Sequence, residues 1–198
     1  MTDWLADAQG DGAATPLTPA EREGLIPTYI TNRAELNEAE QLNILEADTW
    51  AFRRKRDVLD HGLLVSLHKR MLGKVWRWAG AFSGEVNRRI GVDYWLIEAE
   101  LRQLLDDVRY WAENQTFPPD EIAVRFHHRL VVIHPFPNGN GRLSRLASDL
   151  LAVQLGQERF TWGRAILVEA AETRRLYVAA LRAADMHDIG PLLAFARS

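Results

Sequence analysis

The chain has 198 residues, of which 47% are hydrophobic and 26% charged, and its formal net charge is −3 at pH 7. This length and composition fit one globular domain with a substantial core, and the slight negative charge argues against broad binding to nucleic acid or anionic membranes, which needs a basic surface. Because there is no cysteine, disulfides, thiolate catalysis and cysteine-ligated zinc are excluded.

The sequence carries no signal for a membrane. No run of uncharged apolar residues approaches the roughly 20 that span a bilayer. The start, MTDWLADAQGDGAATP, is acidic and lacks the basic and apolar parts of a signal peptide. We therefore expect a cytoplasmic protein without a nucleic-acid or membrane partner.

The first half of the chain predicts a leader, two helices and a hairpin. Residues 1–30 lack apolar periodicity and begin rich in Gly, Ala, Asp and Pro, which predicts a mobile leader and connector. From Asn32 to about residue 52, mostly apolar residues recur at helical spacing, and residues 59–78 repeat this pattern. Glycines and short β-prone pieces in 79–95 then predict a β-hairpin flap.

The second half predicts only helices and the turns between them. The helix that ends near residue 133 is stopped by Pro135 and Pro137, because proline interrupts helical hydrogen bonding. The whole pattern predicts a mostly α-helical single domain with one hairpin. The expected helical ranges are 96–113, 120–133, about 142–154, about 168–184 and about 188–197.

One turn, HPFPNGNGRLSR at residues 134–145, carries the chemistry. Gly139 and Gly141 have no Cβ, so backbone can approach a ligand closely. A helix begins directly afterwards, and its first N–H groups lack partners and favour an anion. Arg142 and Arg145 project from the same side of that helix. Two guanidinium groups beside such a turn predict a polyphosphate site.

The competing interpretation is an ordinary loop between helices, capped by Asn138 or Asn140. The combination of His134 with both arginines favours the phosphate site instead. The turn is not a Walker loop, because no lysine follows the glycine and no strand precedes it. His134 ends the preceding helix, where it is either structural or a general base for a hydroxyl, and the neighbouring phosphate site favours the base.

Other histidines and aromatic residues carry weaker signals. His127 and His128 are adjacent on a helix and point in different directions, and no His-x-x-x-His spacing exists, so no structural zinc is expected. His61 and His68, seven residues apart, are equally poor ligands. Tyr177 could stack on adenine, but core packing is favoured.

The turn resembles the signature of Fic domains, His-Pro-Phe-x-Asp/Glu-Gly-Asn-Gly-Arg-x-x-Arg. VWRWAGAF resembles the segment that leads into the family's flap, and LYVAALRAADMHDIGPLLAFAR its closing helices. GLIPTYITNRAELNEAEQLNI and DEIAVRFHHRLVVIHPFPNGNGR resemble most the group called mobile mystery protein B. The resemblance implies a Fic-type helical domain over residues 31–198, including a candidate inhibitory helix at about 31–52.

The resemblance also implies a protein adenylyltransferase, which transfers AMP from ATP to a Tyr, Ser or Thr hydroxyl of a target protein or of itself and releases pyrophosphate. His134 would be the general base, and Phe136 would hold the loop in the core. Asn140 and the backbone at Gly139 and Gly141 would bind the α- and β-phosphates. Arg142 would bind the β-phosphate side and Arg145 the γ-phosphate.

The flap would clamp the target segment by strand-like pairing, through Ile90, Gly91, Val92, Asp93 and Tyr94. Ser83 stands where relatives often have arginine, so the flap contacts should differ. Asn138 replaces the acidic residue that binds Mg²⁺ in the family. An amide oxygen can ligate a hard cation but adds no charge, so we expect weak Mg²⁺ binding or a site completed by the nucleotide's own oxygens.

Many Fic proteins carry an inhibitory helix with the pattern Ser/Thr-x-x-x-Glu-Gly/Asn. Thr31 and Glu35 fit this spacing, although Leu36 replaces Gly or Asn. The resemblance predicts that Glu35 pairs with Arg145 and blocks the γ-phosphate. The alternative is that Glu35 only completes a capping box at the start of the helix.

Two other functions stay open. Doc-like relatives bind the nucleotide in reverse and transfer the γ-phosphate as protein kinases, although the complete Gly-Asn-Gly-Arg favours AMP transfer. A nucleotide-binding regulatory or toxin–antitoxin component with little catalysis is the other alternative, which Asn138 makes conceivable.

Overall fold

The structure is a computed structural model that describes residues 23–84, 91–164 and 170–198. Most of these residues lie in helices, which confirms the prediction of a mostly α-helical protein. The elements are α2 (Arg33–Phe52), α3 (His61–Leu72), the short 3-10 helix η3 (Tyr94–Leu96), α4 (Ile97–Glu113), α5 (Pro119–Ile133), α6 (Asn140–Gln154), α7 (Ala170–Asp185) and α8 (Gly190–Arg197). None of the helices in these ranges is long and apolar enough to cross a membrane.

Parts of two predicted features lie outside the described residues. Residues 1–22 hold most of the predicted leader, and residues 85–90, with Ile90, hold the middle of the predicted hairpin. The hairpin therefore stays a prediction, although residues on both sides of it are described below.

The helix predicted over 59–78 is too long, because α3 ends at Leu72. A Cβ at Gly73 would lie 2.4 Å from the carbonyl oxygen of Lys69, so only glycine fits this close turn. The residues that follow pair with the connector instead of continuing the helix. The Ile26 N–H donates to the Val75 carbonyl oxygen over 2.8 Å, and an antiparallel bridge joins Leu25 to Trp76.

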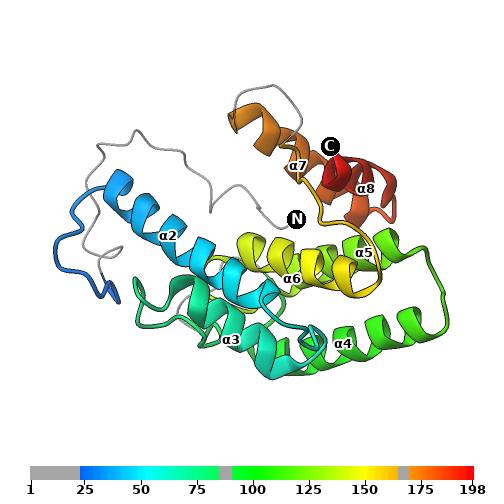
Figure 1. Cartoon of the computed structure of the whole chain (residues 1–198), viewed down its shortest axis with the longest axis horizontal. Coiled ribbons are helices and arrows are strands. Elements are labelled where there is room, and N and C mark those ends of the chain that lie inside the picture. Colours follow the sequence, from blue (N-terminus) through cyan, green and yellow to red (C-terminus); the bar gives the residue numbers. More distant parts are fainter. Residues whose placement is uncertain (1–22, 85–90, 165–169) are drawn as a thin grey trace.

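The helices surround a core to which the motif helix α6 is central. Figure 1 shows α6 in the middle of the molecule, with α2 and α3 on one side and the α7–α8 pair at the opposite end. Apolar side chains from α3, α4, α5 and α6 fill the interior, as their helical spacing predicts. The largest fully buried side chains include Leu64, Leu67, Met71, Leu101, Leu104, Phe126, Leu130, Ile133, Phe136 and Leu143.

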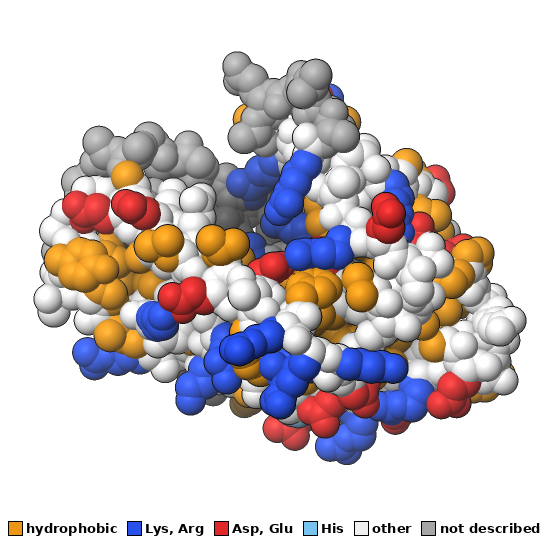
Figure 2. All heavy atoms as spheres, viewed as in Figure 1, with side chains coloured by type: hydrophobic (Ala, Val, Ile, Leu, Met, Phe, Trp, Pro, Cys, Tyr) orange, Lys and Arg blue, Asp and Glu red, His pale blue; other side chains and the backbone are white. Residues whose placement is uncertain are grey.

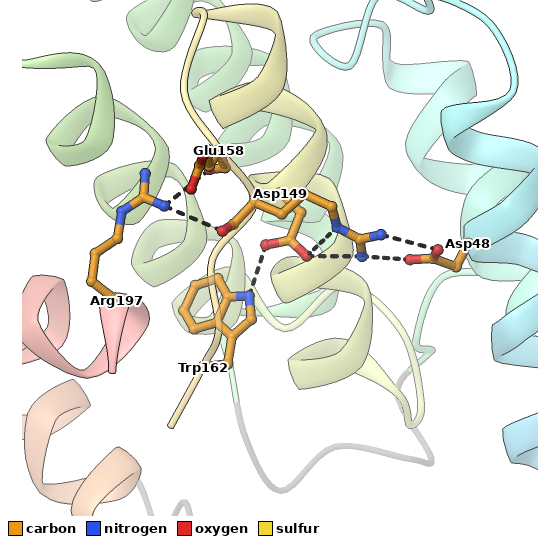
Figure 3. Close-up of polar contacts among 6 residues, drawn as sticks. Asp48, Asp149, Glu158, Trp162 and Arg197 are labelled. Carbon is orange, nitrogen blue, oxygen red and sulfur yellow. Dashed lines mark hydrogen bonds and ion pairs between the residues drawn. The ribbon is translucent and has the colours of Figure 1, made fainter. Parts of the chain in front are cut away.

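A polar network fixes the far end of α6 to its neighbours (Figure 3). Arg159 donates to Asp48 of α2 and, over 3.1 Å, to Asp149 of α6. Asp149 also accepts from the Trp162 indole over 2.8 Å. Burial raises the pKa of Asp149, while Trp162 and Arg159 act in the opposite direction. The network therefore joins α2, α6 and the loop after α6 at a buried carboxylate.

Candidate active site

The turn between α5 and α6 is folded by one buried amide. His134 ends α5 in the left-handed conformation, with φ 53° and ψ 57°, and is half-buried. The Asn140 side chain is 2% exposed; its Oδ1 accepts from the Phe136 N–H over 2.9 Å and its Nδ2 donates to the Phe136 carbonyl over 2.6 Å. The Asn140 amide thus joins both backbone groups of Phe136 and holds the turn closed.

The two glycines of the turn have different roles. Gly139 is left-handed, with φ 79°, and a Cβ there would lie 2.7 Å from Leu72 Cδ1. A Cβ at Gly141 would meet nothing within 4 Å. Among the described residues, no side chain caps α6, so its first backbone N–H groups have no side-chain partner at the positive end of the helix dipole. This arrangement is suited to an anion.

Arg142, the first motif arginine, contacts a carboxylate that the sequence did not identify. Its Nη1 donates to Oε2 of Glu40 on α2. The other carboxylate oxygen, Oε1, accepts from the Trp76 indole over 2.6 Å. The Glu40 residue is 7% exposed. An available signal was its position on the buried face of α2, four residues after Leu36.

Arg145, the second motif arginine, packs near the half-buried Tyr177, which contacts the buried His127. Its Nε donates to the Gly141 carbonyl over 3.1 Å, and its Cζ lies 5.5 Å from the centre of the Tyr177 ring. The Tyr177 hydroxyl lies 2.9 Å from His127 Nε2. Burial raises the pKa of Tyr177 to about 12 and lowers the pKa of His127 to about 3. This geometry agrees with the core-packing interpretation of Tyr177.

The described contacts of Glu35 do not include the predicted pair with Arg145. The Glu35 carboxylate accepts from the Thr31 N–H over 2.7 Å and from the Thr31 hydroxyl over 3.1 Å. The Glu35 N–H donates to Oδ1 of the N-cap residue Asn32 over 3.1 Å. The bond from the Thr31 backbone is the main cause that lowers the pKa of Glu35. Glu35 is therefore a capping residue of α2, as the alternative interpretation held, and no ion pair of Arg145 occurs within the described ranges.

Both ends of the predicted flap contact the backbone beside His134. On one side, the Ser83 N–H donates to the Pro135 carbonyl over 2.9 Å. On the other side, the Val92 N–H donates to the Ile133 carbonyl over 3.3 Å. A Cβ at Gly91 would lie 2.7 Å from His134 Cβ, so the glycine permits this close approach.

The remaining flap residues continue away from this contact. Asp93 precedes η3 and Tyr94 begins it, and both are exposed. Ser83 is 7% exposed and bonds through its backbone, so a serine is accommodated where an arginine was expected from relatives.

His68 is a second residue that the sequence did not identify. Its ring stacks on Phe136 with centroids 3.8 Å apart, Nε2 lies 3.0 Å from the Asn138 carbonyl oxygen, and Nδ1 accepts from the Gly80 N–H over 2.9 Å. Burial is the main cause that lowers its pKa to about 4. Its place on the buried face of α3, beside Leu67, was the available signal.

The side chains of the turn do not fit a magnesium site held by the protein. Asn138 is exposed, and its Oδ1 accepts from the N–H of Gly139. Within the described ranges, no three His, Asp or Glu side chains gather as metal ligands would. Mg²⁺ therefore stays a prediction that depends on oxygens of the nucleotide.

The surface above α6 is hollowed. Figure 2 shows a hollow between α2 on the left and α7 at the upper right, with Lys and Arg side chains gathered on the α7 side. Two other pockets lie elsewhere, one beside the start of α3 and one between the C-terminal ends of α2 and α6. Neither is lined by His134 or the motif arginines, so we place the site by its side-chain geometry.

Comparisons with known proteins identify a family for part of the chain. Residues 58–152 match the sequence model of the Fic/DOC family. Protein adenylyltransferase fic-1 of Caenorhabditis briggsae is 33% identical over 100 residues, which are 50% of this chain and 18% of that protein. The chain thus spans only a small part of the curated relatives it matches.

Solved structures share the fold. BepC of Bartonella tribocorum, with bound AMPPNP, has a TM-score of 0.64 at 15% identity, over 91% of this chain and 97% of that chain. The N-terminal FIC domain of Bep8 from Bartonella sp. 1-1C has a TM-score of 0.67 at 15% identity, over 89% and 95%. The narrower likeness to mobile mystery protein B stays a prediction. With its helical fold and the matched segment 58–152, which includes residues 134–145, the chain contains a Fic/DOC family domain.

Proposed function

We propose that this protein transfers AMP from ATP to a Tyr, Ser or Thr hydroxyl of a target protein. The observation that carries the proposal is the meeting of three features: His134 at the end of α5, the uncapped start of α6 with its two arginines, and the flap residues Gly91 and Val92 against His134. Relatives named protein adenylyltransferase support the same reaction.

The start of α6 would hold the phosphates. Backbone N–H groups at Asn140, Gly141 and Arg142 face the anion, and the helix dipole adds to their attraction. The guanidinium groups of Arg142 and Arg145 neutralise the charge on the β- and γ-phosphates. Stabilising the charge that develops on the leaving pyrophosphate is the main task of such a site.

His134 would accept the proton of the incoming hydroxyl. The target oxygen attacks the α-phosphorus, a new P–O bond forms, and the bond from the α-phosphorus to the bridging oxygen breaks. Pyrophosphate leaves with that oxygen, and the hydroxyl proton passes to the imidazole. The flap, from Gly91 to Tyr94, would hold the target segment so that its hydroxyl approaches His134.

Inhibition by the protein itself would act through Glu40. Its carboxylate occupies part of the Arg142 guanidinium, which is the group proposed to bind the β-phosphate side. A nucleotide must compete with this bond, because the Glu40 carboxylate and a phosphate both accept from the N–H groups of Arg142.

The test is incubation with ATP labelled at the α- or the γ-phosphate, with and without Mg²⁺, followed by detection of labelled protein. Retention of the α label by the wild type, and its loss in His134→Ala with ATP binding unchanged, is the expected result. Retention of the γ label alone would establish phosphorylation instead. Retention of neither label, with ATP bound, would leave a nucleotide-binding component.

A further inference from the structure

His68 lies outside the motif, yet it bonds to both parts of the proposed site. It lies on α3 and is fully buried. One ring nitrogen contacts the turn at Asn138, and the other contacts Gly80 in residues 80–83, which we call the base of the flap. The two partners, the Asn138 carbonyl and the Gly80 N–H, come from segments that are far apart in sequence. A single rigid ring thus spans the interval between them.

The two bonds fix the protonation of the ring. Nδ1 accepts from a backbone N–H, so it carries no proton. The single proton of the neutral ring is then on Nε2, which donates to the Asn138 carbonyl over 3.0 Å. A pKa of about 4 keeps the ring in this neutral form under ordinary conditions.

Each bond holds a segment that the proposed reaction needs. Asn138 directly precedes Gly139 and the first N–H groups of α6, so the position of its carbonyl sets the start of the phosphate-binding turn. Gly80 is left-handed, with φ 86°, and begins the segment that leads to Ser83, whose N–H bonds to Pro135. Phe82, which lies between Gly80 and Ser83 in sequence, also contacts Phe136, with ring centroids 5.3 Å apart.

We propose that His68 is a positioning residue that holds the phosphate-binding turn and the base of the flap in register, one through each ring nitrogen. This inference rests on the proposed function, because it assigns the turn to the nucleotide and the flap to the target. A residue that only filled the core would act through its stack on Phe136 and would show no difference between its two nitrogens.

Two substitutions test the two ring nitrogens of His68 one at a time. The amide of asparagine occupies the position of Nδ1 and can accept from Gly80, so His68→Asn keeps the flap bond and loses the turn bond. The amide of glutamine reaches the position of Nε2 and can donate to Asn138, so His68→Gln does the reverse. His187→Asn, an exposed histidine between α7 and α8, is the control.

Two measurements without turnover give the result. Titration calorimetry with a non-hydrolysable ATP analogue reports on the turn, and amide hydrogen exchange at Ser83 reports on the flap base. We expect His68→Asn to weaken analogue binding about tenfold, which is about 1.4 kcal/mol, with exchange at Ser83 near that of the wild type. We expect His68→Gln to bind the analogue normally and to exchange at Ser83 about tenfold faster, with no change in His187→Asn.

Equal changes in both variants, or lowered thermal stability with neither readout changed, would overturn the proposal. The test of His68 can be distinguished from the test of the proposed AMP transfer. A wild type that binds the analogue but transfers no AMP contradicts the reaction, while the difference between the two His68 variants still decides the role of this residue. A wild type that binds no analogue overturns both.

Discussion

Glu40 and His68 make contacts that could not be predicted from the sequence. Glu40 meets a partner 102 residues away and His68 a partner 70 residues away. The motif itself predicted Arg142 and Arg145, because a short turn and the helix after it bring nearby residues together. Contacts between distant segments follow from packing, which local spacing does not specify. The contacts of Glu35 with Thr31 and Asn32 lie within four residues, where local spacing does specify them.

The contact of Glu40 with Arg142 has a direct test. We expect Glu40→Gln to raise self-modification from α-labelled ATP about tenfold or more, because a hydrogen bond to a charged group contributes about 1.5–3 kcal/mol and a neutral amide holds the guanidinium less tightly. The matched control is Glu35→Gln, whose carboxylate contacts Thr31 instead, and its rate should equal that of the wild type. A Glu40→Gln rate at or below that of the wild type, with the helical circular dichroism intact, would contradict competition at Arg142.

At the scale of elements, apolar spacing predicted which segments form helices, but it did not predict the C-terminal end of α3. The pattern continued through Trp76 and Trp78, so the helix was expected to reach residue 78. The structure ends it at Leu72 because Gly73 turns the chain and the next residues pair with the connector. Pairing with a segment far back in sequence overrode the local pattern. The ends of α5 and α6, which proline and glycine determine, were predicted within two residues.

The start of α6 allows folding and binding to be separated. We expect Gly139→Ala to destabilise the protein by about 1–2 kcal/mol, because alanine is strained in the left-handed conformation and its Cβ would approach Leu72. Gly141→Ala should leave thermal stability unchanged or slightly higher, because its Cβ meets no atom within 4 Å. It should weaken ATP binding, because the Cβ would occupy space beside the first turn of α6 that we assign to the phosphates. Thermal unfolding and titration with an ATP analogue check both variants. Normal ATP binding by Gly141→Ala would show that the phosphates lie elsewhere.

At the scale of the whole molecule, two buried histidines set the response to acid. Burial lowers the pKa of His127 to about 3 and that of His68 to about 4. Their unfolded-state pKa is about 6.5, so the folded state disfavours the proton. The resulting stability is present above about pH 6.5 and is lost as the pH falls toward the folded-state values. Asp149, whose pKa burial raises, acts with the opposite sign.

We expect the free energy of unfolding to fall by about 2–3 kcal/mol per pH unit between about pH 6 and pH 5, since each histidine contributes about 1.4 kcal/mol per unit. Urea unfolding at a series of pH values measures this slope. His68→Gln should reduce the slope to about half, because one of the two groups is gone. An equal slope in the variant would show that other groups dominate.

The carboxylate shared by Arg142 and Trp76 has a spectroscopic consequence. Indole emission depends on the charge and hydrogen bonding around its ring nitrogen, and Glu40 accepts from that nitrogen over 2.6 Å. On the proposed function, a bound phosphate would draw Arg142 away from Glu40 and change the field at the indole, so nucleotide binding should alter the fluorescence of Trp76. This change in fluorescence should vanish in Trp76→Phe. Trp76 would then serve as an intrinsic fluorescent reporter of nucleotide binding.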